Sequence, residues 1–455
     1  MPLPIFGKKS VASIITGMKP LLRARHNRSV QHALLLIPLI CLMFCCPEVS
    51  SRERGPAEHT ISAGVARVNI TPEVPVVMAG YGSRTQPFEG INDSLYAVAT
   101  VFDDGLTRAA IIMVEVLAFP HTVWEEITTR IENETAIPRD HILLVPTHTH
   151  GAPSTRITDD SDRHLIDYNR MLADKIVAVT AEAAGSIRPA LIGSGRGVCK
   201  MSMNRRALNA AGGIRIGRNP YGPCDHEVGV VRIDNANGEP FSLIVNWPTH
   251  ATVMGPGNLM VTGDWPGAAR RYIEREAPLP VSAIITAGAS GDIDPIYRVR
   301  PDFRESEMEE IGIILGREVL RVAEGIETYP AGSVSAMQRV ITLSGKKPAQ
   351  SWKPEEVYEP GPDLDVRLSM LRVGNILFAG ISGEVFTEIG MKVKELSPFR
   401  HTWVITHCNG ASGYLVTDNA YKEGGYEPSV TRAMPGAEGA IIGNLVEMMY
   451  TIGVE

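Results

Sequence analysis

Two histidines that are two residues apart, His148 and His150, could bind one metal ion. They lie in a Thr-His-Thr-His sequence at 147–150, which follows the apolar run 142–145 and precedes Gly151. The apolar run predicts a buried strand, and the Gly and Pro residues after it predict a turn. In an extended segment side chains alternate between faces, so both imidazoles would point the same way. We therefore predict that this strand end presents two metal-binding groups to one cavity.

Four further polar clusters also follow predicted strands. Their candidate residues are His250 after the strand 241–246, Asp292 and Asp294 after 281–285, Glu384 after 376–379, and Tyr414 with Tyr426 after 403–405. Ligands of α/β proteins usually bind at strand ends. Two imidazoles and a carboxylate suit a zinc ion with an open position for water, whose pKa falls to about 7 on the metal. The residues therefore indicate a metallohydrolase, and the sequence has no HExxH, GxSxG, P-loop or Rossmann motif of another enzyme class.

Predicted strands and helices alternate along much of the chain. The apolar runs predict strands at 63–69, 97–102, 109–116, 141–145, 228–233, 241–247, 281–285, 333–343, 368–373, 376–379 and 403–405. Segments with helical periodicity lie at 123–134, 165–185, 268–276, 306–326, 385–396 and 437–450. This mixture predicts an α/β fold, in which one large catalytic domain has mixed β-sheets flanked by helices.

Charge and composition exclude nucleic acid as a partner. Hydrophobic residues make up 44% of the 455 residues and charged residues 21%, as in ordinary soluble globular proteins. The first 54 residues are basic, with 8 Lys/Arg and 2 Asp/Glu, and the remaining 36 basic and 49 acidic residues leave a net charge of −13. A surface that binds nucleic acid would need the opposite sign.

The N-terminus has the pattern of an export signal. Basic residues precede a short apolar core at 33–44, and Val49-Ser50-Ser51 offers small residues for cleavage. We predict an export signal or an uncleaved signal anchor over 1–51, a disordered linker over 52–60 and the catalytic domain over 61–455. The protein is thus expected to be periplasmic, secreted or anchored by the apolar segment, with peripheral membrane contact as one option and the oligomeric state left open.

The order of these clusters along the chain and their residue sequences resemble the catalytic domain of the neutral/alkaline, non-lysosomal ceramidase family. The resemblance covers roughly residues 61–452. Its stretches are, in family order, 64–72, 78–81, 90–96, Thr-His-Thr-His at 147–150, 247–254, Gly-Asp-Ile-Asp-Pro at 291–295, Gly383-Glu384 and 413–421. The resemblance implies a zinc cofactor and a lipid or small-molecule amide substrate, by analogy an N-acyl sphingolipid.

The resemblance also assigns roles to individual residues. The family's zinc ligands, two His, a Glu and a Tyr, fall on His148, His250, Glu384 and Tyr414. The residues that bind or polarise the scissile carbonyl in the family fall on His150, Arg205 and Tyr426. Fixed donors at a developing oxyanion are worth about 3 kcal/mol each.

Two departures from the family pattern bear on the substrate. Asp294 stands where the family has a catalytic serine, and an ionised carboxylate cannot donate a hydroxyl proton. It could act as a general base, or bind a second cation together with Asp292. The family's C-terminal β-sandwich domain is not expected in this chain. Three hypotheses therefore stay open: an exported zinc amidohydrolase, a non-catalytic binding protein on the same scaffold, and a dinuclear hydrolase of another ester or amide.

Overall fold

The computed structural model of the chain describes residues 60–297 and 305–453. The predicted export signal over 1–51 lies outside these ranges, as does the predicted linker over 52–60 apart from its last residue. Within the described ranges, no helix is long and apolar enough to cross a membrane.

The larger sheet has eight strands in the order β12-β10-β9-β6-β1-β3-β4-β5. These strands are β1 (Ser62–Asn69), β3 (Tyr96–Asp103), β4 (Arg108–Val114), β5 (Ile142–Pro146), β6 (Arg188–Val198), β9 (Glu227–Asn235), β10 (Pro240–Trp247) and β12 (Ser282–Ala287). The two edge strands pair in parallel, β5 with β4 and β12 with β10, and the strands between them pair antiparallel. Both edge strands are apolar and buried, which indicates that other elements cover them.

A second sheet of four strands packs on one face of the first. Its order is β14-β15-β16-β18, with the strands β14 (Val334–Leu343), β15 (Leu364–Val373), β16 (Ile376–Ile381) and β18 (His401–Ile405). Phe378 and Trp403 from this sheet share one buried apolar cluster with Met113 and Val145 of the larger sheet. The core between the sheets is therefore made by the inward-facing residues of both.

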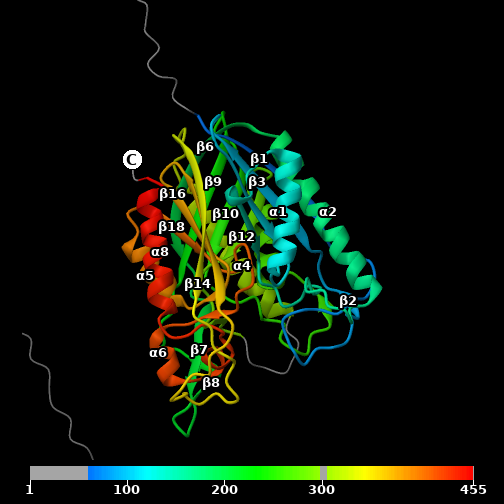
Figure 1. Cartoon of the computed structure of the whole chain (residues 1–455). Helices are drawn as coiled ribbons and strands as arrows, with labels where there is room; N and C mark the ends of the chain where they lie inside the picture. The colour runs from blue at the N-terminus through cyan, green and yellow to red at the C-terminus, as the bar shows by residue number, and fades with distance from the viewer. Residues whose placement is uncertain (1–59, 298–304, 454–455) are drawn as a thin grey trace, which may run out of the picture. The chain divides into compact units, whose positions relative to one another are not determined.

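Helices cover the outer faces of the two sheets. The helices α1 (His121–Thr135), α2 (Arg163–Gly185), α3 (Asp264–Glu276) and α4 (Glu305–Glu324) pack on the larger sheet, and α5 (Thr387–Leu396) and α8 (Ala437–Thr451) pack on the smaller one. Figure 1 shows α1 and α2 on one side of the sheets and α5 and α8 on the other. The layers follow the order helix, sheet, sheet, helix, which confirms the predicted α/β fold with mixed sheets flanked by helices.

Shorter elements shape the ends of the sheets. They are β2 (Gly90–Ile91), η1 (Arg139–His141), β7 (Ser202–Leu208), β8 (Ile214–Asn219), β11 (Met260–Val261), β13 (Ile293–Pro295), β17 (Glu384–Val385), β19 (Tyr414–Leu415), α6 (Asp418–Glu423) and α7 (Tyr426–Val430). Three of them form the sheet β13-β7-β8, and β17 pairs with β19. These short pairings hold most of the candidate site residues.

The strand β6 was absent from the sequence prediction because it contains glycine at alternate positions. Gly193, Gly195 and Gly197 all face the end of α4 and the chain after it. A Cβ on Gly193 would lie 2.2 Å from the Glu327 carbonyl oxygen, and one on Gly195 would lie 2.9 Å from a Val322 methyl group. The glycines thus allow close packing of the helix on the sheet, and they also remove the apolar alternation that identifies a strand.

Asn409 closes the free edge of β5. Its side-chain oxygen accepts hydrogen bonds from the Leu144 backbone N–H at 2.8 Å and the Trp124 indole N–H at 3.0 Å. Its amide nitrogen donates to the Ile142 carbonyl at 2.7 Å and to Ser369 Oγ at 2.9 Å. One buried side chain therefore satisfies the edge of the strand that leads to His148.

We expect Asn409→Ala to lower the free energy of unfolding by about 3 kcal/mol or more, because each buried polar group left unpaired costs about 1–3 kcal/mol. Urea denaturation measures the difference. The exposed Asn375, whose side chain bonds to the Tyr329 hydroxyl, is the matched control. Asn375→Ala should change stability by less than about 0.5 kcal/mol, and equal effects of the two substitutions would contradict the role of Asn409.

Candidate metal centre

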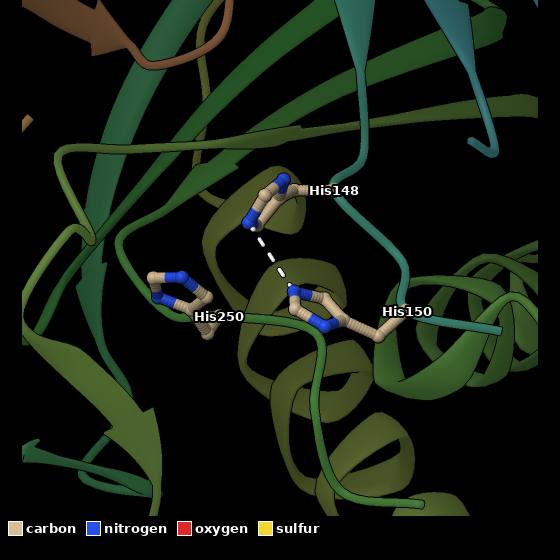
Figure 2. A group of neighbouring side chains, drawn as sticks. All are labelled: His148, His150 and His250. Carbon is tan, nitrogen blue, oxygen red and sulfur yellow. Dashed lines mark hydrogen bonds between the residues drawn. The ribbon is translucent and has the colours of Figure 1, made fainter. Parts of the chain in front are cut away.

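The segments that follow β5 and β10 are joined to each other. Thr149 and Ala251 form an isolated parallel bridge, and the His150 backbone N–H donates to the Ala251 carbonyl at 3.2 Å. This bridge brings His148 and His150, from the first segment, beside His250, from the second. Figure 2 shows the three imidazoles turned toward a common space.

The two histidines of the Thr-His-Thr-His sequence converge, but not for the predicted reason. His148 has a φ of 62°, in the left-handed region, so the segment is not extended as the sequence analysis assumed. The turn nevertheless places His148 Nε2 and His150 Nε2 3.4 Å apart, with the ring planes at 89° (Figure 2). The two imidazoles thus lie together as expected, whereas the strand alternation used to predict this was wrong.

A glycine makes room for the His150 ring. Gly80 has a φ of 102°, and a Cβ at this position would lie 2.4 Å from His150 Nδ1. The Tyr81 ring lies 4.8 Å from the His150 ring, and the Arg84 guanidinium donates to the His150 carbonyl at 2.5 Å. Only glycine fits at position 80, because a Cβ there would overlap the His150 ring.

The tautomers of His148 and His250 follow from their backbone contacts. His148 Nδ1 lies 2.9 Å from the Leu117 carbonyl oxygen, and His250 Nδ1 lies 2.7 Å from that of Ser290. A carbonyl oxygen can only accept, so Nδ1 carries the proton in both rings. The Nε2 lone pairs then face Glu384 Oε2, at 3.7 Å from His148 and 3.3 Å from His250.

This arrangement of acceptors fits a cation. Lone pairs that face a carboxylate at these distances repel each other unless a proton or a metal ion lies between them. Donor atoms about 2.1 Å from a tetrahedral zinc ion stand about 3.4 Å from one another, close to the distances of 3.7 and 3.3 Å from Glu384 Oε2 to the two imidazole nitrogens. Imidazole nitrogens whose other N–H is fixed by a carbonyl are also typical of zinc ligands. The residues His148, His250 and Glu384 therefore fit a zinc ion.

The pKa values of His148 and Glu384 keep these two residues in their ligand forms. Burial lowers the pKa of His148 well below its ordinary value, so that its imidazole is neutral at pH 7. Burial alone would raise the pKa of Glu384, but His250 and His148 outweigh it and hold that pKa well below the usual range. A neutral imidazole and an ionised carboxylate are the forms that bind a metal.

Glu384 and Tyr414 lie side by side because β17 and β19 pair in parallel. Glu384 is opposite Tyr414 in this pair, and the Glu384 N–H donates to the Gly413 carbonyl at 2.8 Å. The Tyr414 hydroxyl accepts a hydrogen bond from Arg205 Nη2 at 3.0 Å. Burial raises the pKa of Tyr414 well above its ordinary value, so the hydroxyl is protonated at neutral pH.

Arg205 connects the remaining predicted residues. Its Nη1 lies 3.4 Å from His250 Nε2 and 3.3 Å from Asp294 Oδ1. Asp294 reaches this position because β13 pairs antiparallel with β7, where Met203 is its partner. The Tyr426 ring lies 5.7 Å from the Tyr414 ring, at the beginning of α7. All of the predicted residues except Asp292 are thus connected to His148, His250 and Glu384, either directly or through Arg205 or Tyr414.

Asp292 instead supports the backbone. Its oxygens accept hydrogen bonds from the Thr387 N–H at 2.8 Å and from the Asn204 side chain at 2.9 Å. Burial raises the pKa of Asp292 to about 7. Among the residues that the structure describes, neither Asp292 nor Asp294 belongs to a group of side chains able to hold a metal.

Two residues of the site were not among the predicted ones. Glu427 is buried and accepts from Arg205 Nε at 2.7 Å and from Arg206 Nη1 at 3.0 Å. His407 is also buried, and its ring stacks on that of His148 with 3.7 Å between the centroids. The sequence could have indicated His407, because it follows a predicted strand by two residues, as His148 does. The local sequence does not distinguish Glu427 from an ordinary surface residue, since a glutamate beside a tyrosine is common on protein surfaces.

Comparison with known proteins identifies relatives of this chain. Residues 61–290 match the family described as neutral/alkaline non-lysosomal ceramidase, N-terminal. The neutral ceramidase of Pseudomonas aeruginosa is 23% identical over 311 residues, which cover 62% of this chain and 44% of that protein. Neutral ceramidase B of Dictyostelium discoideum is 25% identical over 402 residues, covering 80% and 51% respectively. The chain thus spans about half the length of these relatives.

Solved structures share the fold. A ceramidase in complex with C2 aligns with a TM-score of 0.74 at 18% identity, over 87% of this chain and 76% of that one. The neutral ceramidase from Pseudomonas aeruginosa aligns with a TM-score of 0.72, also at 18% identity, over 87% and 75%. The matched family region contains His148, Arg205 and His250, whereas Glu384, His407 and Tyr414 join the site only through the fold.

We expect Glu427→Ala to destabilise the protein by about 3–5 kcal/mol, because it leaves two buried guanidinium groups without their shared carboxylate. Glu423 is the matched control, since it also pairs with Arg206 but its side chain is 42% exposed. Glu423→Ala should cost less than about 1 kcal/mol. Chemical denaturation of both variants measures the contrast, and similar losses would contradict the bridging role of Glu427.

Proposed function

Because the chain belongs to the neutral/alkaline non-lysosomal ceramidase family, we propose that it is a zinc-dependent hydrolase of N-acyl amides of the ceramide type. The observation that carries the proposal is the cluster of Nε2 and carboxylate lone pairs formed by His148, His250 and Glu384. Tyr414 completes the ligand set that the family resemblance implies. Zinc bound there would supply Lewis acidity and favour the deprotonation of water at neutral pH.

The residues around the cluster would bind the amide. Arg205 is buried, positively charged and fixed by Glu427, so it can donate to the oxygen of a scissile carbonyl without reorganising. His150 and Tyr426 approach the same space from the segments after β5 and β19. These three side chains would orient the carbonyl and stabilise the negative charge that develops on its oxygen.

Asp294 would serve as a proton acceptor rather than a hydroxyl donor. Its Oδ1 lies 3.3 Å from Arg205 Nη1, and the guanidinium favours the ionised carboxylate. In the proposed reaction Asp294 takes a proton from the attacking water and returns it to the leaving amine nitrogen. The same aspartate is the one observation that favours the second candidate, a binding protein without turnover, because the family's serine is missing.

The cellular site and the membrane contact are part of the same proposal. The basic and apolar N-terminal segment supports export, and a ceramide-like substrate would bring the protein to a membrane surface at least transiently. N-terminal sequencing of protein from the extracytoplasmic fraction would locate the cleavage site. Retention of the whole protein in the cytoplasm would overturn the export part and leave the chemistry untouched.

We expect purified wild-type protein to contain about one zinc ion per chain, and His148→Ala and His250→Ala each to lose most of it, because each removes one of the converging donors. Metal analysis by mass spectrometry measures the ratio. His226→Ala is the control, since His226 lies half-buried beside Ser202, outside the cluster. Undiminished zinc in both cluster variants would rule out the site.

We expect the wild type to hydrolyse a fluorescent N-acyl amide, and removal of the metal by a chelator to abolish the activity until zinc is restored. Asp294→Asn should lower kcat by about 100-fold or more, because general base catalysis typically contributes about 10²–10⁴. Asp294→Ser, which restores the family residue, should retain more activity than Asp294→Asn. Zinc-loaded wild type with no turnover on a panel of amides and esters would favour the binding protein.

A further inference from the structure

His407 is a buried histidine that the proposed hydrolysis does not use. The residue is 2% exposed. Among the described residues its Nε2 has no hydrogen-bond partner, and no ion pair joins its side chain to a carboxylate. A buried polar atom without a partner costs about 1–3 kcal/mol. If His407 served only for packing, an apolar ring at this position would make the protein more stable. The unpaired Nε2 therefore indicates a role other than packing.

The His407 ring lies directly against the candidate metal cluster. One ligand atom each from His407, His148 and Glu384 lie within 4.8 Å of one another. The His407 and His148 rings are stacked, with 16° between their planes and 3.7 Å between their centroids. The three residues therefore form a group of donors that shares two members with the proposed zinc site.

The backbone fixes His407 in this position. The Thr406 N–H donates to the Ala287 carbonyl at 3.0 Å, and the His407 N–H donates to the Gly383 carbonyl at 3.1 Å. The Val385 N–H in turn donates to Thr406 Oγ1 at 3.2 Å. His407 and Glu384 are thus held to each other through the residues that flank them.

His407 repeats the geometry of His148 on the second sheet. Each histidine follows its strand by two residues, His148 after β5 and His407 after β18. Each has a left-handed backbone, with φ of 62° and 56° respectively. A left-handed conformation is uncommon for residues other than glycine, although histidine adopts it more often than most, and it clusters at functional sites where surrounding contacts enforce it.

We propose that His407 is a further ligand, which supplies another imidazole to the zinc ion held by His148 and Glu384. The inference rests on the proposed zinc site and extends it beyond the two His, one Glu and one Tyr that the resemblance implies. An added imidazole would raise the affinity for zinc and would favour a soft nitrogen-binding metal over magnesium or calcium.

The test uses the full chain with one equivalent of zinc and the variants His407→Gly and His407→Phe. Glycine accepts the left-handed backbone, and phenylalanine keeps the ring that stacks on His148. X-ray absorption fine structure should count one imidazole fewer on zinc in both variants than in the wild type. The dissociation constant for zinc should rise by about 10- to 100-fold, and added imidazole should restore part of it in His407→Gly only.

His401→Phe, at the beginning of the same strand β18, is the control and should leave the imidazole count and the zinc affinity unchanged. An unchanged imidazole count in both His407 variants would overturn the inference while leaving the proposed zinc site intact. Loss of affinity in His407→Gly with normal affinity in His407→Phe would overturn it too, because packing alone would then explain the effect. Wild-type protein that binds no zinc would overturn this inference and the proposed function together.

Discussion

The site depends on the segment 406–409, which crosses from one edge of the eight-stranded sheet to the other. At one end the Thr406 N–H bonds to the Ala287 carbonyl, where β12 ends, and at the other the Asn409 N–H bonds to the Leu144 carbonyl in β5. The two edge strands lie at opposite ends of the order of the sheet and do not pair with each other, although residues of the two strands are in contact. The residues that follow β18 in the second sheet add hydrogen bonds to both of these strands.

This crossing explains why the polar residues of so many strand ends reach one place. The segment after β5 carries His148, that after β10 carries His250, and both are fixed by backbone carbonyls that hold the Nδ1 protons. Glu384 comes from the second sheet and is held next to the crossing segment, since the Gly383 carbonyl accepts from the His407 N–H. The scaffold therefore holds lone pairs from both sheets against one another, which is favourable only with a positive charge between them.

The sequence predicted the parts of this arrangement that depend on local patterns. The predicted strands and helices, and the polar residues at strand ends, follow from apolar periodicity and turn residues that each segment carries itself. His407 was overlooked although it follows its strand as His148 does. Glu427 could not be chosen on the same basis, because its importance lies in its contacts with Arg205 and Arg206, which are far away in the sequence. The strand β6 was missed for a related reason. Its glycines are needed because α4 packs closely on the strand, and this packing in the folded protein cannot be recognised from the local sequence.

The aspartate at 294 changes what Arg205 can do in the site. A serine at this position would leave the guanidinium free to attract a substrate carbonyl, whereas Asp294 shares Nη1 at 3.3 Å and neutralises part of its field. The loss is limited because Glu427 and the Tyr414 hydroxyl bind the other two guanidinium nitrogens, so Arg205 keeps its orientation. In the proposed reaction, the weaker attraction of Arg205 for the oxyanion would be offset by a carboxylate that can accept a proton from water. The proposed chemistry would thereby use a carboxylate that accepts a proton in place of a hydroxyl that donates one, which is compatible with amide and ester substrates alike.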